Sequence, residues 1–164
     1  MKLSTPSSTL TRLANTTAYA VGDLVADHAT AGSVTVPTLA VGKVGGRHYY
    51  IPRIRLTTDK TSGMGAINFT LRIWSSTPTY TNGDNGAWAV ATNGNALLEE
   101  YTNNGFVQSA DGAVAIFTPK VGEGVSFYLA GTQTTIAWDL EIESSLTPAS
   151  AQVLTAIAEV YEVS

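Results

Sequence analysis

Two histidines are the side chains of this sequence most suited to act as a general base near neutral pH. His28 follows Asp27 in a polar stretch, and His48 stands just ahead of a strand-like run. A serine nucleophile would need a turn such as Gly-x-Ser-x-Gly to expose its hydroxyl, and the sequence contains no such turn. We therefore expect both histidines to be ordinary surface residues rather than members of a catalytic triad.

Neighbouring carboxylates occur at two places in the sequence. Glu99 and Glu100 are adjacent, and Asp139, Glu141 and Glu143 alternate along one strand-like segment. Glycoside hydrolysis needs two carboxyl groups that face each other across a cleft, one of them in an apolar setting. Three acids on one face of a strand are explained more simply as a solubilising edge, so we expect no catalytic residue among them.

Two glycine-containing stretches resemble ligand loops only in part. Residues 81–86 are rich in oxygen ligands but lack the regularly spaced acids of an EF-hand loop. Residues 42–46 hold three glycines, yet no helix signature follows that could bind phosphate. The chain has no cysteine and therefore no thiolate metal site. We expect no metal, no cofactor and no enzymatic activity.

The three tryptophans have different expected roles. Trp138 lies on an alternating apolar face and is expected in the core. Trp74 lies on the opposite, polar face of its strand, and Trp88 lies in a loop region. Exposed tryptophans can anchor a protein interface or stack on sugars, and either side chain can also be covered by a loop. We name Trp74 and Trp88 as candidate interface residues.

Alternation of apolar and polar residues is the dominant signal, and it predicts strands with one buried face. The clearest segments are 50–56, 67–74, 125–130 and 136–143, and weaker ones are 8–13, 19–25, 33–41 and 113–118. Pro52 lacks a ladder donor, so it indicates an edge position or a bulge. Residues 59–65 read as a hairpin loop between the first two segments. If those segments pair, then Arg53, Arg55 and Arg72 share one exposed face.

Turn signals complete the expected fold. The Asn-Gly or Asp-Gly pairs at 82–83, 93–94, 104–105 and 111–112 offer the positive φ angles that tight turns need. Residues 95–101 are the one convincing short helix candidate, and 152–163 are expected to form a strand rather than a helix. This spacing of short strands predicts an all-β fold, a β-sandwich or jelly-roll-like single domain over residues 19–164.

Residues 1–18 are expected to form an extended N-terminal arm. This stretch is rich in Ser and Thr and has few apolar anchors. We predict that it lies along a neighbouring subunit or another protein, with Lys2, Leu3, Thr5 and Arg12 as candidate contacts. On that basis, deletion of residues 1–9 should leave the melting temperature nearly unchanged.

The charge composition excludes several classes of partner. The net charge is −4 and only 13% of the residues are charged, which argues against broad contact with nucleic-acid phosphates. No run approaches the roughly 18 apolar residues of a membrane span, and no secretory leader is evident. We expect a soluble protein made in the cytoplasm, with neither nucleic acid nor membrane as a partner.

The charges are divided unevenly along the chain. Residues 1–76 hold eight basic side chains and three acids, whereas residues 77–164 hold one basic side chain and ten acids. The two halves can neutralise each other within one folded domain. Alternatively, the basic strands of one subunit can meet the acidic strands of a neighbour. Under the second alternative, Arg53, Arg55 and Arg72 are interface residues.

Several segments resemble a family of tailed-phage and prophage head decoration (cement) proteins. The run from Leu10 to Val25, Leu-Thr-Arg-Leu-Ala-Asn-Thr-Thr-Ala-Tyr-Ala-Val-Gly-Asp-Leu-Val, is similar to the family's opening Arg-Pro-Ala-Asn-Thr-Thr-Ala-Tyr-Ala-Ala-Gly-Asp-Val-Val. Further similar blocks are 50–56, 69–74 with 78–79 and 84–87, and 146–151. The chain departs from the family at Leu13, where Pro is usual, and in a longer 88–112 region.

The resemblance implies a β-sandwich module on the capsid surface of a virion, without catalytic residues. Its implied partner is the major capsid protein of a tailed phage, and it implies a role in stabilising capsomer joints. A homo-oligomer is expected, with a trimer favoured over a dimer. The alternative is a receptor- or carbohydrate-binding β-module of a phage fibre or tail, in which exposed aromatics such as Trp88 would bind the ligand.

Overall fold

The computed structural model describes residues 2–42, 45–59, 68–102, 106–110, 115–119 and 122–163. Two short 3-10 helices, η1 (Ala31–Ser33) and η2 (Gly94–Ala96), are the only helical elements among these residues, so the expected all-β class is confirmed. No helix in this part of the chain is long and apolar enough to cross a membrane. The strands are β1 (Lys2–Ser4), β2 (Ser7–Thr11), β3 (Leu24–Val25), β4 (Thr38–Ala40), β5 (Arg47–Thr58), β6 (Phe69–Trp74), β7 (Thr79–Tyr80), β8 (Val90–Thr92), β9 (Leu97–Tyr101), β10 (Phe106–Ala110), β11 (Ala115–Pro119), β12 (Val125–Leu129), β13 (Thr135–Ile142) and β14 (Val153–Glu162).

The larger sheet has the order β1-β14-β5-β11-β10, with β2 also pairing β14 and β12 also pairing β5. All its pairs are antiparallel. In β14 the residues alternate between buried and partly exposed, which confirms the expected strand at the C-terminus. This alternation turns Leu154, Ala156, Ala158 and Val160 towards the interior.

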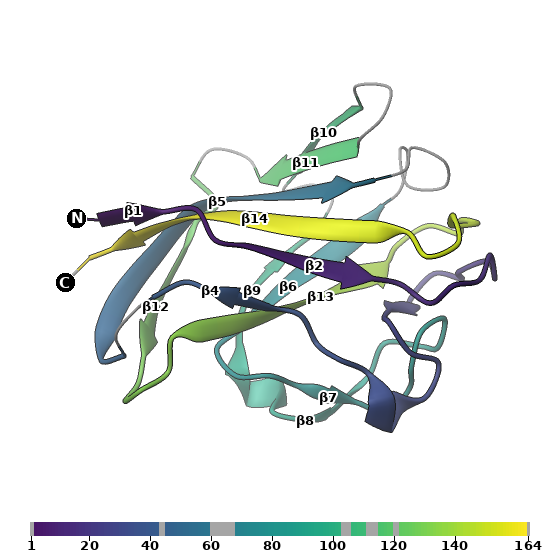
Figure 1. Cartoon of the computed structure of the whole chain (residues 1–164), viewed down its shortest axis with the longest axis horizontal. Helices are drawn as coiled ribbons and strands as arrows, with labels where there is room; N and C mark the ends of the chain where they lie inside the picture. The colour runs from purple at the N-terminus through teal and green to yellow at the C-terminus, as the bar shows by residue number, and fades with distance from the viewer. Residues whose placement is uncertain are drawn as a thin grey trace.

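The smaller sheet has the order β3-β13-β6-β9, with β4 also pairing β13. Figure 1 shows it beneath the larger sheet, with β7 and β8 at the bottom of the view as a separate pair. The main core fills the space between the two sheets, and Trp138, Phe69 and Leu56 are among its fully buried side chains. Each such side chain contributes roughly 1.5–3 kcal/mol through its burial. The expected β-sandwich and the core position of Trp138 are confirmed.

Pro52 lies at a bulge, as expected. Between the pairs Glu159↔Arg53 and Tyr161↔Tyr50, β14 advances two residues while β5 advances three. The extra residue on β5 leaves one position out of the ladder, where a missing N–H donor costs nothing. The bulge also reverses which residues of β5 face inward, because Ile51 and Ile54 are both buried.

The helix expected at residues 95–101 is wrong. Only Gly94–Ala96 form a 3-10 turn, and Leu97–Tyr101 form β9, the outer strand of the smaller sheet beside β6. The run Leu-Leu-Glu-Glu-Tyr has good helical propensity, but pairing with β6 satisfies its backbone and buries Tyr101. Tertiary context thus overrides local propensity.

The expected hairpin between residues 50–56 and 67–74 is also wrong. β5 pairs with β14, β11 and β12 in the larger sheet, whereas β6 pairs with β13 and β9 in the smaller one. Residues 60–65 of the expected hairpin loop lie outside the described residues. Arg72 therefore does not share a face with Arg53 and Arg55, and its own side chain is buried.

The N-terminal segment, expected as an arm, supplies strands of the sandwich itself. β1 pairs with the end of β14 and β2 with its beginning. Leu10 is buried in the main core, and Trp138 Nε1 donates to Ser8 Oγ at 3.0 Å. This arrangement differs from the expected division at residue 18. Contact of this segment with a neighbouring subunit remains a prediction.

Candidate functional site

The structure contains two buried polar clusters, and they include Asp139 and Arg72, which were expected on exposed strand faces. The first is the Asp139 cluster, which comprises Asp139, Arg72, Trp74, Tyr80 and Trp88. Antiparallel pairing of β13 with β6 sets Asp139 directly opposite Arg72 on the outer face of the smaller sheet. That face is not open to solvent, because all six residues of β6 are buried.

Asp139 is the hub of this cluster. Trp74 Nε1 and Tyr80 OH each donate to its Oδ2 at 2.6 Å, and Trp88 Nε1 donates to its Oδ1 at 3.3 Å. Arg72 Nη1 lies 3.8 Å from the same Oδ1, too far for a hydrogen bond. Asp139 itself is only 2% exposed. The carboxylate therefore connects β13, β6, β7 and the segment before β8.

Arg72 links the cluster to further carboxylates. Its Nε donates to Glu100 Oε2 on β9 at 2.6 Å, and its Nη2 is paired with Glu141 on β13. The guanidinium carbon lies 3.7 Å from the centroid of the Trp88 ring, a cation–π contact. Since the charge of Arg72 is shared among acids of its own chain, it is not displayed to a partner.

Burial sets the protonation of the cluster. It raises the pKa of the Asp139 carboxyl from 3.8 to about 6, although the hydrogen bonds and Arg72 act in the opposite direction. Burial and the charge of Asp139 together raise the pKa of Tyr80 well above its usual value. Tyr80 thus remains a protonated donor, while Asp139 is mostly ionised at neutral pH and gains a proton in mild acid.

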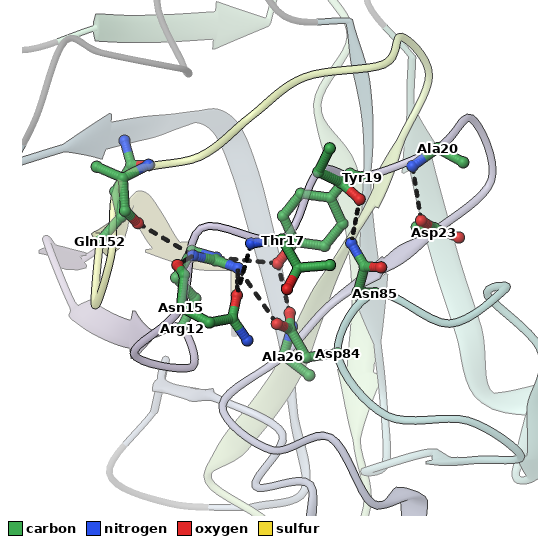
Figure 2. Close-up of polar contacts among 12 residues, drawn as sticks. Arg12, Asn15, Thr17, Tyr19, Ala20, Asp23, Ala26, Asp84, Asn85 and Gln152 are labelled. Carbon is green, nitrogen blue, oxygen red and sulfur yellow. Dashed lines mark hydrogen bonds and ion pairs between the residues drawn. The ribbon is translucent and has the colours of Figure 1, made fainter.

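The second cluster, the Arg12 cluster, comprises Arg12, Asn15, Tyr19 and Asp84. Arg12 Nη2 lies 3.3 Å from Asp84 Oδ2, and both side chains are 0% exposed. Arg12 Nε donates to Tyr19 OH at 3.0 Å, and that hydroxyl in turn donates to Asp84. Asn15 accepts from the guanidinium through its backbone and its side chain. Figure 2 shows these side chains converging from two stretches of the chain, residues 12–19 and the loop that carries Asp84.

The oxygen-rich stretch 81–86 positions Asp84 in this cluster. A Cβ at Gly83 would lie 2.3 Å from the backbone of Ala29, so only glycine permits this close packing. Asp84 N donates to His28 O at 2.7 Å, and Asn85 has φ of 62°. The carboxylate of Asp84 therefore points to Arg12 and to the backbone N–H of Ala26 rather than to a cation site.

Neither cluster is arranged for catalysis. The Asp139 and Asp84 oxygens are already engaged by several donors and closed to solvent, so neither carboxylate is available as a base or nucleophile. A cavity of about 10 Å³ beside Asp139 and Tyr80 has room for about one water molecule. Among the residues that the structure describes, no three His, Asp or Glu side chains gather to form a metal site. Both clusters instead hold loops against the β-sandwich.

The candidate interface residues fall into two groups. Arg12, Arg72 and Trp74 are buried in the chain's own clusters, and Trp88 is partly buried beneath Arg72. Leu3, Thr5 and Arg53 are exposed and Arg55 is partly exposed, whereas Lys2 is placed only by its backbone, in the outer strand β1. The structure leaves the buried side chains no free surface for a partner, whereas Leu3, Thr5, Arg53 and Arg55 are placed where a partner can reach them.

The two oppositely charged halves of the sequence meet within one molecule. In the part of the chain that the structure describes, each ion pair joins a base from residues 1–76 to an acid from residues 77–164. Arg53, for example, pairs with Glu159 across β5 and β14. These contacts favour neutralisation inside the domain over pairing between subunits.

One exposed feature was missed from the sequence, an aromatic patch on the outer face of the larger sheet. It consists of His48, Tyr50, Tyr128 and Tyr161 and is called the tyrosine face below. The register places Tyr161 opposite Tyr50 and Tyr128 opposite His48. Alternation in 125–130 indicates that Tyr128 points outward, but the partners of each strand were needed to bring the four rings together.

Comparison with known proteins gives only distant similarities. No family model and no curated protein matches the chain. Among solved structures, a carbohydrate-binding module specific for non-crystalline cellulose is 9% identical, with a TM-score of 0.34 over 78% of this chain and 66% of that one. A chain of the cyanophage Pam1 capsid is 12% identical, with a TM-score of 0.34 over 99% and 85% of the two chains. A PRD1 vertex protein is 13% identical, with a TM-score of 0.33 over 94% of each. The structural neighbours thus include viral capsid proteins and a binding module, and at these scores the similarity supports no conclusion about function.

Proposed function

We propose that this chain is a non-enzymatic structural protein of a tailed-phage virion that decorates the capsid. In this role it binds the major capsid protein on the assembled head and stabilises the joints between capsomers. Many copies bind repeated sites, so each contact can be modest while the whole set resists the pressure of the packaged DNA. A homo-oligomer, with a trimer favoured over a dimer, belongs to the same proposal.

The Arg12 cluster is the observation that carries this proposal. Arg12, Asn15 and Tyr19 come from the segment that most resembles the decoration family, and Asp84 comes from another resembling block. In the fold these two blocks meet in one buried ion pair. The residues behind the resemblance are therefore those that build the scaffold, which supports a shared fold rather than a chance match of surface residues.

The use of the ionisable groups supports a structural role as well. The Asp139 and Arg12 clusters pin loops to the sandwich instead of lining a cleft. The exposed part of the chain is polar with few charges, and its described ion pairs are internal. Such a surface packs against a neighbour without strong long-range repulsion.

Quantitative mass spectrometry of purified virions tests the proposal. The number of copies of this chain is measured relative to the major capsid protein. A ratio near one, or a simple fraction such as one third, is expected for shell decoration. A handful of copies would place the protein in the tail or neck, and absence from the virion would overturn the structural role.

A further inference from the structure

The tyrosine face lies at the end of the larger sheet where the two termini meet, at the left of Figure 1. Its side chains point away from the core, because their neighbours Tyr49, Phe127 and Val160 are buried. One row across the strands runs Leu3, Tyr161, Tyr50, Ser126. The next row runs Val163, His48, Tyr128.

Exposed apolar surface is concentrated here. Of the five large hydrophobic side chains that are exposed in the described chain, three belong to these two rows: Leu3 at 52%, Tyr128 at 51% and Val163 at 46%. The rings of His48 and Tyr128 lie 5.0 Å apart. A cluster of exposed apolar side chains on an otherwise polar surface is often functional, unlike single apolar residues scattered over the surface.

The side chain of Tyr50 lies flat against the sheet. A Cβ at Gly124 would come within 2.7 Å of its ring and hydroxyl, so the ring lies over the bare backbone at the start of β12. Tyr50 nevertheless remains partly exposed. The absence of a side chain at residue 124 therefore leaves room for the ring of Tyr50.

The face carries little net charge. Arg53 pairs with Glu159 in the adjoining row, and Arg47 pairs with Glu162 at the strand ends, with 3.7 Å between Arg47 Nη1 and Glu162 Oε1. The polar groups left on the face are tyrosine hydroxyls, an imidazole and the Ser126 hydroxyl. These groups hydrogen-bond uncharged hydroxyls well, and neither row contains a Lys or Arg that would attract a phosphate or carboxylate.

The size of the face decides between a protein and a smaller ligand. Four strands about 4.8 Å apart, over the four or so residues that two rows span at about 3.3 Å each, give an area of roughly 250 Å². A stable protein interface takes about 800 Å² from each partner. The face is thus about a third of the size that a stable dimer requires, but it can accommodate several sugar rings.

We propose that the tyrosine face binds a neutral oligosaccharide. The apolar C–H faces of the sugars pack on the rings of Tyr50, Tyr128 and Tyr161, while their hydroxyls bond to the tyrosine hydroxyls, His48 and Ser126. This function goes beyond capsid decoration and does not depend on it. A decoration protein with such a face would also attach its particle to a glycan-bearing surface.

Affinity electrophoresis tests the proposal. The full chain is run through gels that contain hydroxyethylcellulose, xylan, glucomannan or dextran, and it is applied to an array of neutral glycans. We expect retardation by at least one polysaccharide or binding to at least one arrayed glycan. Tyr128→Ala should weaken that binding roughly tenfold. Leu97→Ala, which changes a 40% exposed side chain on the smaller sheet, is the matched control and should bind like the wild type.

Two results would overturn the proposal. One is the absence of binding to every polysaccharide and arrayed glycan, and the other is binding that Tyr128→Ala leaves unchanged. Analytical ultracentrifugation tests the alternative occupant of the face, a second copy of the chain. Self-association that Tyr128→Ala abolishes, without glycan binding, would assign the face to a second copy of the chain. Virion copy number is measured independently, so failure of this proposal and failure of the proposed function are distinguishable.

Discussion

The buried carboxyl group of Asp139 makes the stability of this protein depend on pH in an unusual direction. Its pKa is raised to about 6 in the folded protein, against 3.8 for an aspartate side chain that is free in water. The folded state therefore binds this proton more tightly than the unfolded chain does, and the free energy of unfolding due to this group falls as the pH rises between those values. Above about pH 6 the full cost of the buried charge is present.

Replacement of Asp139 by Asn removes this dependence while it keeps the size of the side chain. As the pH is lowered from 7 to 4, we expect the wild type to gain about 2–3 kcal/mol of stability relative to Asp139→Asn. Urea unfolding of both proteins across this range measures the difference. Parallel stability curves for the two proteins would contradict the pKa shift.

The Arg12–Asp84 pair gives a second prediction at the scale of single residues. Both side chains are fully buried, so loss of one partner leaves an uncompensated charge. Arg12→Met should therefore destabilise the fold by about 3–5 kcal/mol. The double variant with Asp84→Asn should recover part of this loss, because it removes the stranded carboxylate. Thermal unfolding of the wild type, the two single variants and the double variant completes a double-mutant cycle. Strictly additive losses of stability would argue against a direct interaction between Arg12 and Asp84.

At the scale of elements, alternation in the sequence is sufficient to find β6, β12 and β13, and residue composition indicates β14, but neither signal assigns the partners of these strands. β5 and β6 follow each other in the chain yet belong to different sheets. The polar faces of β6 and β13 look solvent-exposed from sequence, because Thr, Arg, Asp and Glu alternate with apolar residues there. Their burial depends on Tyr80 and Trp88, which come from a distant segment. The Asp139 cluster therefore could not be recognised from any single segment, whereas the core position of Trp138 could.

Strands β1 and β2 lead to a prediction that reverses the one made from composition. Deletion of residues 1–5 removes only β1, whose one described apolar side chain, Leu3, is exposed. Deletion of residues 1–11 also removes the pairing of β2 with β14 and the buried Leu10. We expect a small loss of melting temperature from the shorter deletion. The longer deletion should lower the free energy of unfolding by about 2–5 kcal/mol or more, because truncation of a core leucine alone has an effect of this size. Equal melting temperatures would restore the view of the segment as a detached arm.

At the scale of the whole molecule, the uneven charge of the two halves distinguishes a self-contained domain from an assembly held by charge. If the pair Arg53–Glu159 acts inside one chain, Arg53→Glu should lower stability by no more than about 1 kcal/mol, since both side chains are partly exposed. The swapped variant, Arg53→Glu with Glu159→Arg, should then recover that loss and still bind the capsid. Differential scanning calorimetry and co-sedimentation with capsids that lack this protein measure the two properties. If the swapped variant folds normally but no longer binds, Arg53 meets an acid on another chain. Reversal of Arg55, which has no ion-pair partner among the described residues, would then be expected to add to the defect.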